Sequence, residues 1–199
     1  REGESQNSIY AVRSMGIDPS TGREMFLKQN GEVSYTWDAN DQVAVGDLNP
    51  DAQGSVGLRI GWKGFYLNAS FMYQWGAQAY NETLRDKVEN ARIYDQNVDK
   101  RVLTQRWVKP GDRTPFYDMG NDTETQVTTR FVQNYNYFNF SGLSMGYDFD
   151  STLISKWYLR RLGISFNMND IFRLSTVKEE RGTSYPFSRN YSFTLSIGI

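Results

Sequence analysis

Residues 55–76 read SVGLRIGWKGFYLNASFMYQWG, and they alternate apolar with polar or small side chains on both sides of Lys63-Gly64. Alternation with a period of two is typical of a β-strand that has two different faces. Because the residues that flank a two-residue turn pair directly and face the same way, Trp62 and Phe65 are expected to continue one apolar face. The stretch therefore predicts a hairpin of two strands, over residues 55–62 and 65–76.

The same alternation recurs further along the chain, in residues 143–149, 162–168 and 191–199. A weaker strand is predicted over Ser8–Ile17, so that the chain supplies about six strands in all. Within residues 80–107 the spacing of Leu84, Val88 and Ala91 permits one short helix.

One irregularity precedes Leu143. Phe138 and Phe140 have the opposite parity to Leu143, whereas Tyr135 and Tyr137 keep it. A β-bulge near Ser141-Gly142 would return the two phenylalanines to the apolar face, because a bulge adds one residue to one strand.

The connections between these strands alternate strictly between long and short. The long ones span residues 18–54, 77–134 and 173–188, and the short ones are 63–64 and 150–157. Outer-membrane barrels have short periplasmic turns and long extracellular loops, whereas a soluble sandwich has no reason to sort its loops in this way. We therefore predict an all-β chain that forms part of an antiparallel transmembrane β-barrel.

Aromatic residues make up 15% of the chain and gather at the predicted strand ends. Two girdles of aromatic rings are expected of a membrane barrel, since such rings favour the headgroup zone. Bulky rings at strand ends can also fill a protein core, and the sequence leaves this alternative open. One predicted girdle is Trp62, Phe65, Phe149, Trp157 and Tyr158, and the other is Tyr73, Trp75, Tyr135, Tyr137 and Phe172.

The composition excludes several classes of function. The chain contains no Cys and no His, which removes disulfides, thiolate zinc sites and imidazole bases. The formal net charge is -1, so no electropositive field favours nucleic acid. No stretch approaches the roughly 18 apolar residues of a membrane-spanning helix. We expect no enzyme, no catalytic residue, no metal and no cofactor. The first residue is Arg1, and no initiator Met, basic n-region or apolar h-region follows it, so we interpret the chain as mature or cut from something longer.

Two acidic clusters are candidates for chemical sites. Asp38-Ala39-Asn40-Asp41 resembles the start of a calcium loop but lacks its Gly and its distal Glu, so an ordinary polar turn is favoured. Glu179-Glu180 lies beside Lys178 and Arg181, which indicates a solvated charged loop. Neither cluster is assigned catalysis.

Several short stretches, in their order and spacing, resemble one family over essentially the whole chain. That family is the SusC/RagA-type TonB-dependent outer-membrane transporters of Bacteroidetes, in their C-terminal part. The stretches are Gly16-Ile17-Asp18-Pro19 with Thr21-Gly22, Gly46-Asp47-Leu48-Asn49-Pro50, Trp62-Lys63-Gly64-Phe65, Gly76, Tyr80-Asn81, Arg106-Trp107, Pro110-Gly111-Asp112, Arg130-Phe131-Val132, Phe166-Asn167-Met168-Asn169-Asp170-Ile171-Phe172, Tyr185-Pro186 and Tyr191-Ser192-Phe193.

The resemblance implies a plugged barrel of 22 strands in the outer membrane of a Gram-negative bacterium. Residues 1–199 would then be its C-terminal portion, with the plug domain and the N-terminal strands absent from this chain. It also implies a SusD-like surface lipoprotein and TonB as partners, and glycans or peptides as substrates. The terminal Ile199 departs from the aromatic residue that such barrels generally favour.

The long connection 77–134 is the best candidate for contact with substrate or with the lipoprotein, although a loop packed on itself is equally open. Aromatic and arginine residues commonly anchor interfaces. The candidates are Arg85, Arg92, Arg101, Arg106 and Trp107, and no substrate-binding residue is assigned.

Two other functions remain open at this point. A secreted β-rich module could bind glycans by stacking them on exposed aromatic rings, and a passive porin would differ from the importer only in lacking a plug and TonB coupling. The module would have to bury five alternating apolar faces in one small core.

Overall fold

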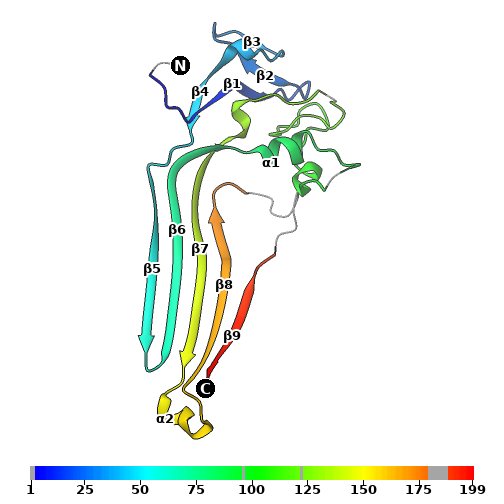
Figure 1. Cartoon of the computed structure of the whole chain (residues 1–199). Coiled ribbons are helices and arrows are strands. Elements are labelled where there is room, and N and C mark those ends of the chain that lie inside the picture. Colours follow the sequence, from blue (N-terminus) through cyan, green and yellow to red (C-terminus); the bar gives the residue numbers. More distant parts are fainter. Residues whose placement is uncertain (1–2, 96, 122, 179–187) are drawn as a thin grey trace. The chain divides into compact units, whose positions relative to one another are not determined.

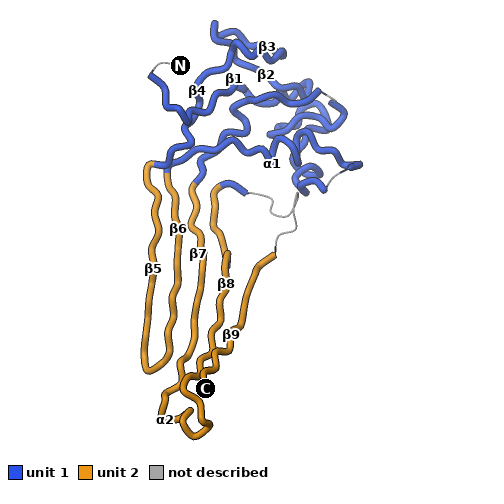
Figure 2. Tube along the Cα trace, viewed as in Figure 1, with its two compact units in different colours: residues 1–50, 76–135, 177–186 blue, residues 51–75, 136–176, 187–199 orange. Residues whose placement is uncertain are grey.

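The computed structural model describes residues 3–95, 97–121, 123–178 and 188–199. The chain divides into two compact units (Figure 2). Unit 1 comprises residues 1–50, 76–135 and 177–186, and unit 2 comprises residues 51–75, 136–176 and 187–199.

Among the described residues, unit 2 holds the main part of a sheet of five strands (Figure 1). The order is β5-β6-β7-β8-β9, and the registered pairs are antiparallel. All five strands predicted by alternation are confirmed: β5 (Ala52–Trp62), β6 (Phe65–Tyr80), β7 (Val132–Asp148), β8 (Arg161–Ser175) and β9 (Tyr191–Gly198).

The predicted hairpin is confirmed in its register. Trp62 pairs directly with Phe65. Lys63 and Gly64 have φ angles of 45° and 86°, and two positive φ angles are what a type I′ hairpin turn requires. The turn therefore fixes which face of both strands carries the apolar side chains.

The bulge in β7 is also confirmed. The register between β7 and β8 shifts between Phe140 and Gly142. On the N-terminal side of the shift, the ring of Phe140 stacks on Phe71 at 4.6 Å between centroids. Its centroid lies 5.7 Å from that of Phe172. One extra residue thus keeps the aromatic rings of three strands on a single face.

The bulge changes the face of Tyr137, which belongs to a predicted girdle. Tyr137 lies under the guanidinium of Arg173, at 4.6 Å from the ring centroid, on the face opposite Phe138. Phe138 instead stacks against Phe71, at 5.6 Å. Because the parity of β7 reverses at the bulge, Phe138 takes the place on the apolar face that was expected for Tyr137.

The apolar face of the sheet is not covered within the described part of unit 2. Ile164 and Leu195 are 47% and 61% exposed, and Phe71 and Leu143 are only partly buried. By alternation within each strand, the same face carries Leu58, Leu67, Met145, Phe166 and Ile197 on the five strands. This is an unusually large apolar surface for a protein that water surrounds.

The segment between β7 and β8 is more than a plain turn. It contains α2 (Ser151–Ile154) and a 3-10 turn, η5 (Ser155–Trp157). The carboxylate of Asp150 caps α2 by accepting from the amide of Thr152 at 2.7 Å.

Unit 1 contains a second sheet, of four strands within the described residues, in the order β3-β2-β1-β4. The weaker predicted strand over Ser8–Ile17 exists as β1, but it belongs to this sheet and not beside β5. The expected long connection 18–54 also holds three short strands: β2 (Glu24–Leu27), β3 (Val33–Ser34) and β4 (Gln42–Asp47).

The predicted short helix in residues 80–107 is confirmed as α1 (Glu82–Leu84), which runs into a π-helical turn, η2 (Arg85–Glu89). Leu84 and Val88 are buried there against Val102, Phe116 and Phe131. Three 3-10 turns complete the described helical elements of this unit: η1 (Ala39–Asp41), η3 (Lys100–Leu103) and η4 (Thr129–Phe131). In the described residues, no helix has the length and apolar character needed to cross a membrane.

Candidate functional site

A buried ionic cluster organises unit 1 around Arg130. Its guanidinium donates to both carboxylate oxygens of Glu24, at 2.7 and 2.6 Å, and to both oxygens of Glu89, at 3.2 and 2.5 Å. A further bond reaches the carbonyl of Pro115 at 2.7 Å. The planar guanidinium suits this paired geometry, since its donors match two carboxylates at once. Arg130 therefore ties β2, η2 and the following loop together.

Arg106 satisfies the backbone of the same loop. It is 7% exposed and donates to the carbonyls of Val88, Glu89, Tyr117 and Asp118 at 2.8–3.0 Å. A buried carbonyl without a donor would be costly, so this side chain holds irregular backbone in place. Its guanidinium is thereby engaged inside the loop.

Burial sets the electrostatics of this cluster. Burial raises the pKa of the Glu89 carboxyl, and the hydrogen bond from Arg130 opposes that rise. Burial lowers the pKa of Arg106. For Arg130 burial acts in the same downward sense, but its bonds to Glu24 and Glu89 outweigh burial and raise its pKa. The cluster is a structural ion pair network, because every charged group in it faces an opposite charge or a carbonyl.

A tight turn beside β1 brings together residues that stand far apart in the sequence. The Asp18 carboxylate accepts from the amide and hydroxyl of Ser20, from the hydroxyl of Thr21 and from the Tyr35 hydroxyl. The Ser20 amide first, and then these hydroxyls, hold the pKa of Asp18 well below its usual 3.8.

Trp107 covers this turn. Its indole Nε1 donates to the carbonyl of Pro19 at 3.0 Å. A Cβ added to Gly22, which has a φ of 71°, would lie 2.7 Å from the indole ring. A glycine is required at this position both by the backbone conformation and by the ring above it.

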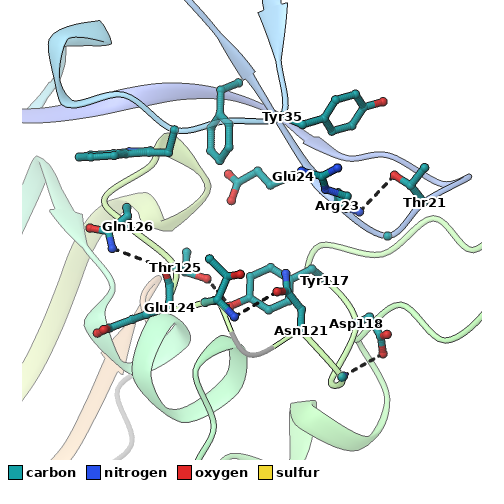
Figure 3. A pocket seen from close by; sticks show the side chains of 15 residues that line it. Thr21, Arg23, Glu24, Tyr35, Tyr117, Asp118, Asn121, Glu124, Thr125 and Gln126 are labelled. Carbon is teal, nitrogen blue, oxygen red and sulfur yellow. Dashed lines mark hydrogen bonds between the residues drawn. The ribbon is translucent and has the colours of Figure 1, made fainter.

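The turn and the cluster border a pocket of about 330 Å³ in unit 1 (Figure 3). Tyr35 and Trp37 supply aromatic walls, and Arg23 lies 5.1 Å from the Tyr35 ring centroid. The remaining lining is mostly polar, from Asp118, Asn121, Glu124, Thr125 and Gln126. Aromatic walls with amide and carboxylate groups suit a small polar ligand, such as a sugar or a piece of peptide.

The predicted contact residues of the long connection have different surroundings. Arg85 pairs with Asp86 at 2.7 Å, Arg101 pairs with Asp99, and Arg92 is exposed. Arg106 and Trp107 bond to backbone carbonyls inside unit 1. For Arg106 and Trp107 the structure therefore agrees with the alternative of a loop packed on itself.

Residues 38–41 form a polar turn, which agrees with the interpretation that the sequence favours. Asp38 caps η1 by accepting from the amide of Asn40 at 2.9 Å, and Asp41 accepts from the amide of Gln29 at 3.0 Å. Across the described residues, no group of three acidic side chains is placed to hold a metal ion. Glu179-Glu180 lies outside the described residues.

The face of the unit 2 sheet opposite the apolar one is polar. Arg59 donates to the side chain of Asn68 at 2.9 Å, and Ser141 donates to the carbonyl of Ser70 at 2.9 Å. A Cβ on Gly146 would lie 2.5 Å from the ring of Tyr66. The two faces of this sheet thus differ sharply, as in a sheet that separates water from hydrocarbon.

Glu24 and Glu89 are residues of the cluster that the sequence did not reveal. Arg106 and Arg130 were marked by the stretches that carry the family resemblance, but their acidic partners were not. Glu24 stands 106 residues from Arg130, and no local pattern links the two.

Comparison with known proteins gives structural matches alone. No protein-family model and no curated protein matches the chain. Three solved structures of the RagAB peptide importer superpose on 96% of the chain, with TM-scores of 0.76, 0.75 and 0.72 and identities of 18%, 19% and 18%. The first and third are the 'open-open' and 'closed-closed' states of the importer. The chain spans 22–23% of the length of those chains. At this identity the likeness concerns the fold, and the fold of this chain is that of a part of the RagAB importer structures.

Proposed function

We propose that the chain is part of the barrel of a SusC/RagA-type TonB-dependent importer in the outer membrane of a Gram-negative bacterium. The observation that carries the proposal is the sheet of unit 2, with one exposed apolar face and one polar face. In the importer the apolar face contacts lipid and the polar face lines the lumen.

The edges of the sheet support the same proposal. β5 and β9 are the outermost strands of the order β5-β6-β7-β8-β9. Open sheet edges do not occur in hydrocarbon, since each unsatisfied backbone group costs several kcal/mol. Further strands, from outside this chain, would pair with both edges and close the barrel.

Transport in this proposal needs no covalent chemistry by the chain. The substrates are peptides or glycans, a SusD-like lipoprotein captures them at the cell surface, and TonB drives uptake through the plug. The fold of the RagAB peptide importer favours peptides as the first class to test. The pocket of unit 1, with its aromatic and amide lining, is the part of this chain suited to contact them.

The test uses the full-length protein in its own bacterium. Fractionation is expected to recover it with the outer membrane, and its deletion is expected to stop uptake of labelled oligopeptides. Collapse of the proton gradient should stop uptake in the same way, and a surface lipoprotein should purify with the protein. Recovery as a stable soluble monomer would reject the proposal in favour of a secreted glycan-binding module, and uptake that persists without the gradient would indicate a porin.

A further inference from the structure

The short-turn end of the unit 2 sheet carries an exposed group of aromatic and basic side chains. Trp157 and Tyr158 follow α2 and are 66% and 90% exposed, and Trp62 at the end of β5 is 69% exposed. Lys63, Lys156 and Arg160 are exposed beside them in the sequence. We call these six residues the turn cluster.

The two turns that supply the cluster are held together by the backbone. The amide of Asp148, at the end of β7, donates to the carbonyl of Gly64 at 2.8 Å. Arg160 is fixed on the other side, because its amide donates to the carbonyl of Gly198 at 2.9 Å. The cluster is therefore built on a bonded frame at the strand ends, where Figure 1 shows α2 beyond the ends of β7 and β8.

The charge of the cluster is positive. Residues 149–160 carry two cations, Lys156 and Arg160, and one carboxylate, that of Asp150, which is engaged in capping α2. Lys63 of the neighbouring turn adds a third cation. Asp148 and Arg161 belong to the opposite, polar face by the alternation of β7 and β8. The ammonium of Lys63 lies 5.2 Å from the ring centroid of Trp62, so a cation and an aromatic ring already share one location.

The arrangement of rings and cations suits contact with a membrane surface. Trp and Tyr rings favour the headgroup zone, and Lys and Arg side chains reach from apolar surroundings to phosphate groups. A basic group near an anionic lipid surface strengthens binding by about 1 kcal/mol, or roughly fivefold in affinity. Leu153, on α2, is also exposed and adds apolar surface to this segment.

We propose that the turn cluster binds the headgroups of anionic phospholipids in the leaflet on the short-turn side of the membrane. This inference rests on the proposed function, because the apolar face must be in lipid for the cluster to meet headgroups. The cations contact the phosphodiester, and the rings of Trp62, Trp157 and Tyr158 lie among the glycerol and upper acyl groups.

The experiment uses the full-length protein in detergent micelles, to which phosphatidylglycerol or phosphatidylcholine is added, with bound lipid counted by native mass spectrometry. We expect phosphatidylglycerol to bind more tightly than phosphatidylcholine, and salt to weaken this preference because it screens exposed charges. The variant K156E/R160E should lose about tenfold or more in affinity for phosphatidylglycerol and little for phosphatidylcholine. The matched control K109E/R113E reverses two exposed charges of unit 1 and should leave both affinities unchanged.

Three results would overturn the inference: equal binding of the two lipids by the unaltered protein, a preference that salt does not change, or equal loss in the control. The first two need no variant, so a folding defect in K156E/R160E cannot hide the answer. Retention of a protein partner in place of lipid would also count against it. Fractionation and uptake measurements test the proposed function separately. If the protein transports normally but shows no lipid preference, the inference is refuted and the proposed function stands.

Discussion

Arg130 donates two hydrogen bonds to Glu24, from Nε and Nη2 at 2.7 and 2.6 Å, although the two residues are 106 positions apart in the sequence. Through the same guanidinium it holds Glu89. Unit 1 depends on this contact because its irregular segments have few regular backbone ladders. The small sheet, the helical turn and the loop over residues 105–125 meet at one side chain.

Replacement of Arg130 by Ala is expected to destabilise unit 1 by about 3–5 kcal/mol, because two buried carboxylates would lose their partner. The measurement is limited proteolysis of the full-length protein, with cleavage sites mapped by mass spectrometry. New cuts should appear in residues 85–125 while unit 2 stays intact. The exposed Arg113→Ala serves as control and should behave like the unaltered protein. An unchanged cleavage pattern for Arg130→Ala would refute the role given to the cluster.

The Asp18 turn gives a pH dependence with a defined sign. Its hydrogen bonds lower the pKa of Asp18 from 3.8, so the folded form binds the proton less readily than the unfolded form. The stability contributed by this carboxylate is complete above 3.8 and is lost as the pH falls below that value toward the folded pKa. The rate of cleavage within residues 18–22 by an acid-stable protease should therefore rise as the pH falls from 5 to about 2.

The control for this prediction is Asp18→Asn, which keeps the shape of the side chain without its titration. Its cleavage in residues 18–22 should be faster at neutral pH and should vary little with acidification. A variant as pH-sensitive as the unaltered protein would show that another group governs the turn.

Insertion of one alanine between Ser141 and Gly142 tests the bulge. With one residue more than the bulge holds, the parity of β7 before it would change, so that Phe138 and Phe140 would turn to the polar face. We expect the full-length protein with the insertion to fail to reach its heat-resistant folded form, as seen by migration on gels without boiling. The substitution Ser141→Ala keeps the backbone and removes one hydrogen bond, to the carbonyl of Ser70, at a cost of about 1 kcal/mol. Equal folding of the insertion and the substitution would mean that the register does not matter.

The sequence predicted the long sheet well because its signals are local. Alternation over many residues fixed β5 to β9, the positive φ angles of Lys63-Gly64 suit a two-residue turn, and the parity break at Phe140 located the bulge. The small sheet was missed because β2 has four residues and β3 has two, which is too short for alternation to register. The ionic cluster was missed because its bonds join distant segments, and adjacent sequence carries no trace of them.

Gly146 tests how closely the polar face is packed. A Cβ there would lie 2.5 Å from the Tyr66 ring and 2.6 Å from the carbonyl of Ile164, so Gly146→Val should force both strands apart. We expect folding stability to fall by about 1–3 kcal/mol, which is typical of overpacking. The measurement is the temperature at which the folded form converts to the unfolded form on gels, which should be lower for the variant. Gly57 has open space at the same point and makes the matched control. If Gly57→Val lowered the temperature as much, the loss would reflect sheet glycines in general and not this contact.

The two faces of β9 provide the sharpest test of the membrane assignment. Leu195 and Thr194 are neighbours and are both exposed, and they point to opposite faces. If lipid covers the apolar face, Leu195→Arg should destabilise the folded protein by about 1–2 kcal/mol, because a charge on the lipid-facing side of a membrane strand is costly. Thr194→Arg should be tolerated, since its side chain meets water in the lumen. The measurement is unfolding by denaturant in phospholipid vesicles, with both variants compared with the unaltered protein. Were both sides of β9 in water, the two arginines would cost the same, and the apolar face of the sheet would need a protein partner in place of lipid.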